Sequence, residues 1–276
     1  MFPILHRLIY GLISGLTEFL PVGSQPHQKI YQHLTGFSAN DPWLKVFVLF
    51  GAFAALLLSL RKQIATINED KKLYKHTMRR RQKGQIPMGE LTDRLYKIAM
   101  IPMLVSVIFY GFAQSIAASF PALIILLFVN GLVLILPRIL PAGNKDGRTM
   151  SRLDGFLIGL GGAVGVLPGI SRVGCGCAIG EARGGKPAYV LDVVLLATVI
   201  PFFVFLCFST LGAISYVERI AMPLFLTDIG SGVLSFAASI AGIRFIRWFC
   251  EKLGLYKFAF YSWVFSVVVF ILYMFV

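Results

Sequence analysis

Apolar residues gather along this chain in six runs that are each long enough to cross a lipid bilayer. A transmembrane helix needs about 17 to 25 predominantly apolar residues. The sequence therefore predicts six spans, at Leu44–Leu60, Ile98–Ser115, Phe120–Pro137, Tyr189–Leu211, Met222–Ile243 and Leu255–Val276. Two further apolar stretches, Phe2–Val22 and Phe156–Ile170, each lead into a proline and then into polar residues.

These two stretches end in the same short pattern, once in each half of the chain. Leu20–Gln25 (Leu-Pro-Val-Gly-Ser-Gln) matches Leu167–Arg172 (Leu-Pro-Gly-Ile-Ser-Arg), and a glycine-rich helix precedes both. Proline breaks a helix, and irregular backbone at membrane depth is tolerated where it is buried in protein or lines a cavity. Duplicated broken helices indicate a ligand site near the midplane of the membrane. We therefore expect the two turns to form one site.

The composition agrees with this membrane class and adds a strong basic bias. Hydrophobic residues make up 57% of the 276 residues, charged residues make up 14%, and the mean hydropathy is +0.77. The formal net charge is +13, and such an excess usually belongs to cytoplasmic segments beside anionic lipid. Nucleic acid is the weaker interpretation, because no basic segment is interleaved with base-stacking aromatic residues.

Three basic segments, 61–97, 138–152 and 244–257, are assigned to cytoplasmic loops. The number of predicted spans between these basic segments places both ends of segment 154–187 on the cytoplasmic side. This segment is therefore predicted to be a re-entrant hairpin. The repeat predicts that the first broken helix is re-entrant from the outside. Both chain termini then lie outside.

The predicted fold class is therefore an all-α integral membrane protein with six transmembrane helices plus two re-entrant helical hairpins. Each half holds one hairpin and three spans, and an odd number of spans gives an inverted-topology repeat of about 1–137 and 154–276. The whole chain forms a single membrane domain. Lipid-facing and protein-facing apolar surfaces have similar compositions, so the sequence is compatible with both a monomer and a homodimer.

The first hairpin carries Glu18, Ser24, Gln25 and His27 as its candidate functional residues. A carboxylate inside an apolar helix costs about 2.5 to 3.5 kcal/mol on insertion scales, so Glu18 should face a wet cavity or a partner. The structural alternative is an ion pair between Glu18 and Arg7. A lone histidine in a loop is usually a surface residue, and His27 is a catalytic candidate only through its neighbours.

The second hairpin places a fixed cation, Arg172, at the tip of a broken helix. A guanidinium gives two parallel hydrogen bonds to one phosphate, and it keeps its proton. Glycines beside it, Gly169 and Gly174, leave backbone N–H groups accessible for the same anion where a helix begins. The alternative is an arginine that extends to the membrane interface, but such a residue does not need a Pro-Gly-x-Ser platform.

Two cysteines follow Arg172 in a Cys-Gly-Cys arrangement, at Cys175 and Cys177. The spacing is not that of a Cys-x-x-Cys redox motif or of a zinc site. Packing of small residues at a crowded turn explains these cysteines more simply.

Both turn motifs resemble those of the undecaprenyl pyrophosphate phosphatase family, also called the bacitracin-resistance phosphatases. The matching residues are Gly15–Val22 (Gly-Leu-Thr-Glu-Phe-Leu-Pro-Val), followed by Ser24 and His27, and later Pro168–Arg172 (Pro-Gly-Ile-Ser-Arg). The resemblance covers the chain from end to end. It implies an enzyme of the bacterial inner membrane that removes the terminal phosphate of a C55 polyprenyl pyrophosphate with Mg²⁺ or Ca²⁺, recycling the lipid carrier of cell-wall synthesis.

The resemblance also implies roles for individual residues. Glu18 would hold the metal or act as a base, Ser24 would be the nucleophile or a phosphate contact, and His27 would transfer a proton. Arg172 would clamp the pyrophosphate, with Ser171 beside it. The remaining candidate phosphate-binding residues are Gly169, Gly174 and Gln25.

The chain departs from the family pattern at several motif positions. The first glutamate of the family's pair is Ser14 here, so one carboxylate that would neutralise a cation is absent. The other departures are Gly23, Gln25, Pro26, Val173 and Gly176. Binding a phosphorylated lipid needs only cations and backbone donors, whereas hydrolysis also needs charge neutralisation and an activated nucleophile. A non-enzymatic flippase or transporter of a polyprenyl phosphate is therefore the alternative function, and a degenerate paralogue with a regulatory role is a third.

Overall fold

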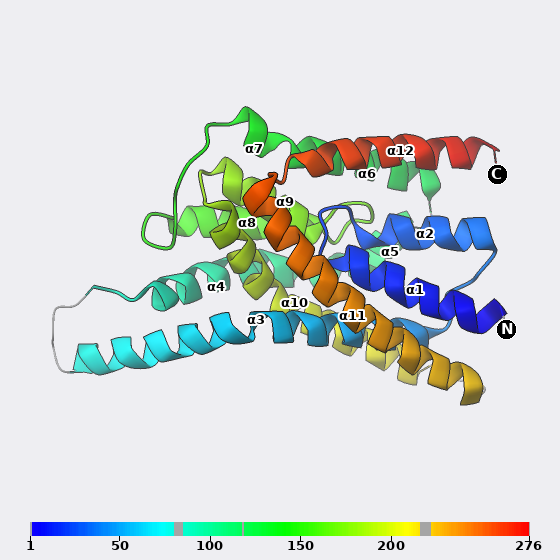
Figure 1. The fold of residues 1–276 in the computed structure, drawn as a ribbon, viewed down its shortest axis with the longest axis horizontal. Helices are drawn as coiled ribbons and strands as arrows, with labels where there is room; N and C mark the ends of the chain where they lie inside the picture. Colours follow the sequence, from blue (N-terminus) through cyan, green and yellow to red (C-terminus); the bar gives the residue numbers. More distant parts are fainter. Residues whose placement is uncertain (1, 80–84, 118, 216–221, 276) are drawn as a thin grey trace.

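The computed structural model of the protein describes residues 2–79, 85–117, 119–215 and 222–275, and these residues are helical with short connections (Figure 1). The first half contains α1 (Phe2–Glu18), α2 (Ser24–Thr35), α3 (Pro42–Arg79), α4 (Met88–Ser106), the 3-10 turn η1 (Val107–Phe109), α5 (Tyr110–Ala117), α6 (Phe120–Leu134) and α7 (Leu136–Ile139). The second half contains α8 (Arg152–Val164), α9 (Arg172–Ala182), α10 (Pro187–Ile214), α11 (Met222–Lys252) and α12 (Lys257–Phe275).

The six predicted spans are confirmed as helices, and several are longer than expected. Helices long and apolar enough to cross a membrane cover Pro42–Thr77, Met88–Ala113, Phe120–Ile139, Pro187–Ile214, Leu224–Lys252 and Lys257–Phe275. The protein is thus an all-α, multi-pass integral membrane protein. The re-entrant character of the two hairpins stays a prediction.

Segment 61–97, assigned to a cytoplasmic loop, contains the end of one helix and the start of the next, because α3 continues to Arg79 and α4 begins at Met88. Its cytoplasmic location stays a prediction. Polar residues with good helix propensity sustain both extensions. The ion pair between Lys71 on α3 and the buried Asp93 on α4, at 3.2 Å, joins them, and Lys97 on α4 also pairs with Asp93, at 2.6 Å. Of the three consecutive arginines at 79–81, Arg80 and Arg81 lie outside the described residues.

Both broken helices end where the sequence pattern predicts. The first, α1, ends at Glu18 and the second, α8, ends at Val164, each ahead of its Leu-Pro pair. The turns that follow contain glycines with a positive φ, 68° at Gly23 and 95° at Gly169. A side chain at these positions would be strained, which explains why glycine occupies each turn.

Helix contacts fall into matched pairs between the two halves. α1 packs on α11 as α8 packs on α4, and α3 packs on α11 as α10 packs on α4. α6 contacts α12, and α3 contacts α10. The same pairs result when α1 is exchanged with α8, α3 with α10, α4 with α11 and α6 with α12. This is the exchange that the repeat of about 1–137 and 154–276 predicts.

Glycines let the matched helices approach each other closely. A Cβ added to Gly15 would overlap the backbone carbonyl of Ser235 on α11, and a Cβ added to Gly159 would overlap that of Ala99 on α4. Membrane helices associate largely through such close backbone packing at small residues. The glycine-rich lead-ins of the repeat therefore have a packing role.

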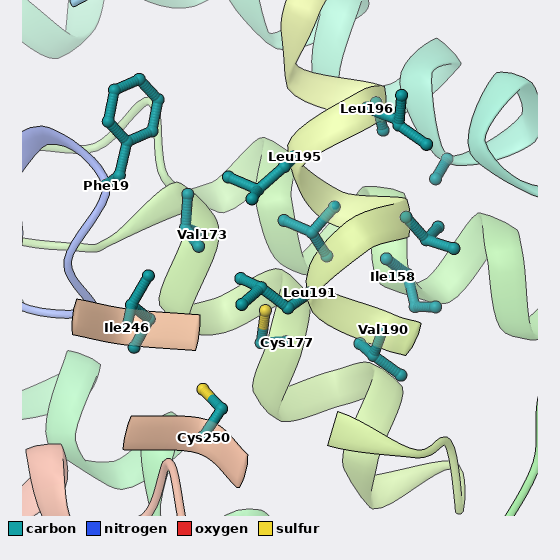
Figure 2. Close-up of a cluster of buried hydrophobic side chains, with 14 of the residues drawn as sticks. Phe19, Ile158, Val173, Cys177, Val190, Leu191, Leu195, Leu196, Ile246 and Cys250 are labelled. Carbon is teal, nitrogen blue, oxygen red and sulfur yellow. The ribbon is translucent and has the colours of Figure 1, made fainter. Parts of the chain in front are cut away.

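The apolar core surrounds the first turns of α10 (Figure 2). Leu191 and Leu195 from α10 meet Val173 and Cys177 from α9, together with Phe19, which immediately precedes the first turn motif. Cys175 and Cys177 are both free and buried. The packing explanation of the Cys-Gly-Cys motif fits their positions.

Both chain termini lie at one end of the molecule, and the end of α3, the start of α4 and the connection between α7 and α8 lie at the other (Figure 1). The count of spans between the basic segments predicts that the termini lie on the opposite side of the membrane from these segments. Which end faces the cytoplasm stays a prediction.

We predict that Gly159→Ala destabilises the protein, because the added methyl group would press on the α4 backbone. Overpacking of this kind typically costs about 1 to 3 kcal/mol. Thermal unfolding in detergent micelles measures the effect. Gly212→Ala on α10 is the matched control, because a Cβ there meets no heavy atom within 4 Å. Equal melting temperatures for the two variants would contradict the close approach.

Candidate anion-binding site

The two repeated turns meet directly. The Ser171 hydroxyl donates to the Leu20 carbonyl oxygen at 2.8 Å, and a Cβ on Gly23 would lie 3.0 Å from the Gly169 carbonyl oxygen. A Cβ on Gly174 would lie only 2.7 Å from the Pro21 Cβ. The expectation that the two turns join is therefore confirmed by their contacts.

A buried asparagine on α6 holds both turns. The Asn130 side-chain amide donates to the Pro21 carbonyl oxygen at 3.1 Å and to the Ser262 hydroxyl at 3.0 Å. Its Oδ1 accepts the Ser171 backbone N–H at 2.9 Å. Sequence reasoning missed this residue, although a lone asparagine in an apolar helix is itself a signal, because polar side chains in membrane segments usually have a specific partner.

A cavity of about 340 Å³ opens beside this junction. Polar residues from one face of α1 and one face of α2 form part of its wall. These residues are Tyr10, Ser14 and Glu18 on α1, and Gln25, Gln28, Lys29 and Gln32 on α2. The spacings of four residues on α1, and of three and four on α2, place each set on one helical face. Residues of the second turn, from Gly165 to Leu167 and from Gly169 to Arg172, close the inner end.

Glu18 and Ser24 form a hydrogen-bonded pair on this wall. The Ser24 hydroxyl donates to Glu18 Oε2 at 2.9 Å. Ser14 lies one helical turn before Glu18 and lines the same cavity. The alternative pairing of Glu18 with Arg7 is wrong, because Arg7 pairs with Asp41 at 2.7 Å and with Asp228. Glu18 therefore faces the cavity, as the cost of an intramembrane carboxylate predicts.

Arg172 lies opposite Glu18 in the same cavity, as the first residue of α9. The charges of Arg172 and Glu18 attract each other across it. Within the described part of the chain, the buried Nε of Arg172 has no hydrogen-bond partner, and neither has Gln25 Oε1. Buried polar atoms normally have partners, so two unpaired ones around one cavity indicate a polar ligand.

The predicted phosphate-binding glycines differ in their surroundings. Gly169 lines the cavity, as Ser171 does. The Gly174 N–H instead donates to the Ser171 hydroxyl at 3.0 Å, as the N-cap bond of α9. Since that N–H is already used and Pro21 covers it, the contacts of Gly174 support a role in packing, and its predicted phosphate contact gains no support.

His27 does not join the residues that line the cavity. Its Nδ1 lies 2.8 Å from the Gly23 carbonyl oxygen and its Nε2 lies 2.7 Å from the Tyr261 hydroxyl. The imidazole also stacks on Phe265, with ring centroids 4.2 Å apart. These contacts attach α2 to α12, so the predicted proton transfer by His27 gains no support from its position.

The cavity also contains polar residues that sequence reasoning did not single out. They are Tyr10, Gln28, Lys29, Gln32, Asn40 and Lys45. The helical spacing of Gln25, Gln28, Lys29 and Gln32 after the first turn was the available signal.

The cavity suits a metal ion only if the ligand supplies part of the coordination. No group of three His, Cys, Asp or Glu side chains able to hold a metal occurs among the described residues. Glu18 and the unpaired Gln25 Oε1 are the available oxygen donors beside Ser24. Mg²⁺ commonly binds through one or two carboxylates together with substrate phosphates. These residues fit a cation of that kind.

The fold and this cavity define a multi-pass membrane protein with a candidate anion-binding site between two broken helices. The chain matches the family described as bacitracin resistance protein BacA over residues 7–268. An undecaprenyl-diphosphatase of Methanobrevibacter smithii is 29% identical over an alignment of 293 residues, covering 97% of this chain and 96% of the relative. One from Carboxydothermus hydrogenoformans is 27% identical over 270 residues, covering 97% and 96%. The chain therefore belongs to the bacitracin resistance protein BacA family.

We predict that Asn130→Ala lowers both stability and any activity, because both turns lose their shared partner. Each buried backbone group left unpaired costs about 1 to 3 kcal/mol. Thermal unfolding in micelles measures the loss, and Asn144→Ala, in the exposed connection before α8, is the control. A melting temperature of Asn130→Ala within error of the control would show that the two turns do not depend on this residue.

Proposed function

We propose that the protein is a membrane phosphatase that hydrolyses a polyprenyl (undecaprenyl) pyrophosphate to the monophosphate, in recycling of the lipid carrier for cell-wall synthesis. Family membership and the names of the relatives support this activity. The observation that carries it is the cavity in which the Ser24–Glu18 pair faces Arg172.

The cavity has the two-sided character that a phosphorylated lipid requires. Opposite the polar faces of α1 and α2, apolar side chains complete the wall: Val48, Leu49, Leu123, Val166, Ile170 and Phe205. A ligand with an anionic head and a hydrocarbon tail satisfies both kinds of surface. A free anion would leave the apolar part of the wall in contact with water.

Arg172 and the start of α9 hold the terminal phosphate in this mechanism. A guanidinium binds phosphate oxygens in pairs, and a helix N-terminus contributes a partial positive charge. Charge that develops on the transferring phosphoryl group is stabilised by the same groups. The unpaired Arg172 Nε supports this assignment, since a phosphate oxygen would give it an acceptor.

Ser24 is the proposed nucleophile and Glu18 its base. Their separation of 2.9 Å lies within the range for an activated hydroxyl. Ser24 Oγ forms a bond to the terminal phosphorus, its proton passes to Glu18, and the bond from that phosphorus to the bridging oxygen breaks. Prenyl monophosphate leaves. Water then attacks the phosphoserine, which releases inorganic phosphate and restores the hydroxyl.

Glu18 and Gln25 would hold a Mg²⁺ or Ca²⁺ ion that arrives with the pyrophosphate. When bound, the ion supplies neutralisation of phosphate charge. Ser14 offers only a hydroxyl where a second carboxylate would strengthen that binding.

We also assign the protein to the bacterial plasma membrane, with both termini outside and segments 61–97, 138–152 and 244–257 in the cytoplasm. The basic character of these segments supports that orientation. The cavity would then open toward the outer face.

We predict that the purified protein releases phosphate from a polyprenyl pyrophosphate in the presence of Mg²⁺ or Ca²⁺. Arg172→Ala should lower the rate by about 100-fold or more, as loss of a transition-state contact does. Released phosphate is the measurement, and Arg61→Ala, an exposed arginine on α3, is the control. Undetectable release with retained lipid binding would reject the phosphatase in favour of a carrier.

We predict that Ser14→Glu raises metal-dependent turnover by about tenfold, the scale of one well-placed charge. The new carboxylate would lie one turn from Glu18 on the cavity face of α1. Rates with added Mg²⁺ and with a chelator measure the effect. Ser14→Gln supplies the same bulk without charge, so an equal response of the two variants would place the metal away from position 14.

A further inference from the structure

Two lysines outside the turn motifs also line the cavity. Lys29 extends the polar face of α2, and Lys45 lies in the first turns of α3. Lys29 is half-buried and Lys45 is exposed. Neither lysine belongs to the repeated motifs.

The cavity holds more cationic than anionic side chains. Its described lining residues include three cations, Arg172, Lys29 and Lys45, and Glu18 as the sole carboxylate. Other lysines of the protein, Lys71 and Lys97, are neutralised by Asp93. Within the described chain no carboxylate forms an ion pair with Lys29 or Lys45. The cavity is therefore prepared for more than one negative charge.

Lys29 and Lys45 line the same cavity, and their positive charges repel each other. Like charges held together destabilise a structure unless an anion lies between or beside them. An anionic ligand between the two lysines would attract both of them and offset their mutual repulsion. Such an arrangement is typical of an anion-binding site.

Nearby contacts anchor the helices that carry both lysines. On α2, the Tyr10 hydroxyl donates to Gln28 Oε1 at 3.2 Å, next to Lys29. The start of α3 is fixed by Asp41, whose Oδ1 accepts the Trp43 N–H at 2.9 Å and which also pairs with Arg7. Lys29 therefore lies in the middle of an anchored helix and Lys45 near the anchored start of another, and their flexible stems supply the remaining reach.

Lys29 and Ser24 are separated by roughly 7 Å of rise along α2. A phosphate bound between Ser24 and Arg172 would thus leave the lysines beyond it, toward the mouth. A diphosphate head group extends past its terminal phosphate in that way, whereas a monophosphate does not.

We propose that Lys29 and Lys45 form a second phosphate subsite, which binds the phosphate of a diphosphate head group that Arg172 does not hold. This inference rests on the proposed function. It makes the two lysines the residues that distinguish a diphosphate substrate from its monophosphate product.

The test uses binding of probes that cannot be hydrolysed, so that it does not depend on catalysis. Geranylgeranyl methylenediphosphonate, geranylgeranyl phosphonate and methylenediphosphonate without a prenyl chain are titrated into the protein in detergent by calorimetry. We expect the wild type to bind the prenyl diphosphonate at least about tenfold more tightly than the prenyl phosphonate, as charge-assisted hydrogen bonds imply.

Lys29→Gln and Lys45→Gln should each weaken diphosphonate binding by about tenfold and leave phosphonate binding unchanged. Lys62→Gln, an exposed lysine further along α3, should change neither. An unchanged ratio in both cavity variants would overturn the subsite. The tail-less probe should bind more weakly than the prenyl diphosphonate, and equal binding would overturn the assignment to a lipid head group.

Phosphate release by the wild type is measured separately and tests the proposed function alone. If release is absent while the lysine variants lose selectivity, the subsite stands and the phosphatase fails. If release is present while selectivity is unchanged, the phosphatase stands and the subsite fails.

Discussion

Interrupting a helix in apolar surroundings leaves backbone groups that need partners, and this requirement controls the structure. Both interruptions are satisfied at one place, since Asn130 donates to the Pro21 carbonyl oxygen and accepts the Ser171 N–H. Water could do the same at a surface, but unsatisfied groups inside a membrane cost several kcal/mol each. One buried amide therefore joins two segments far apart in the chain and fixes the turns that carry the site.

The imbalance of charge around the cavity follows from the same arrangement. Joining the turns brings Arg172 opposite Glu18, and the polar faces of α1 and α2 add lysines but no further carboxylate among the described residues. A protein that held a divalent ion permanently would show the opposite balance. The cavity is thus organised for an anion, with any metal ion accompanying the ligand.

Much of this organisation could be predicted from the sequence. The hydrophobic runs predicted the six spans, and the repeated Leu-Pro pattern predicted the joined turns with Glu18, Ser24 and Arg172 around them. Asn130 and Lys45 were missed because their importance depends on which helix face meets which neighbour, and a single helix does not encode its partner. The contact of His27 with Tyr261, from the far end of the chain, could not be predicted for the same reason. The length of α3 could not be predicted from apolar runs, because its second half is polar.

The length of α3 links the two ends of the molecule. Its 38 residues span about 57 Å, nearly twice the hydrocarbon thickness of about 30 Å. One end carries Lys45 at the mouth of the cavity, and the other is joined to α4 through Asp70, which accepts the Gly89 N–H at 2.7 Å. A single continuous helix thus carries both attachments, so the placement of Lys45 beside the cavity and the docking of α3 on α4 depend on the same stretch of backbone.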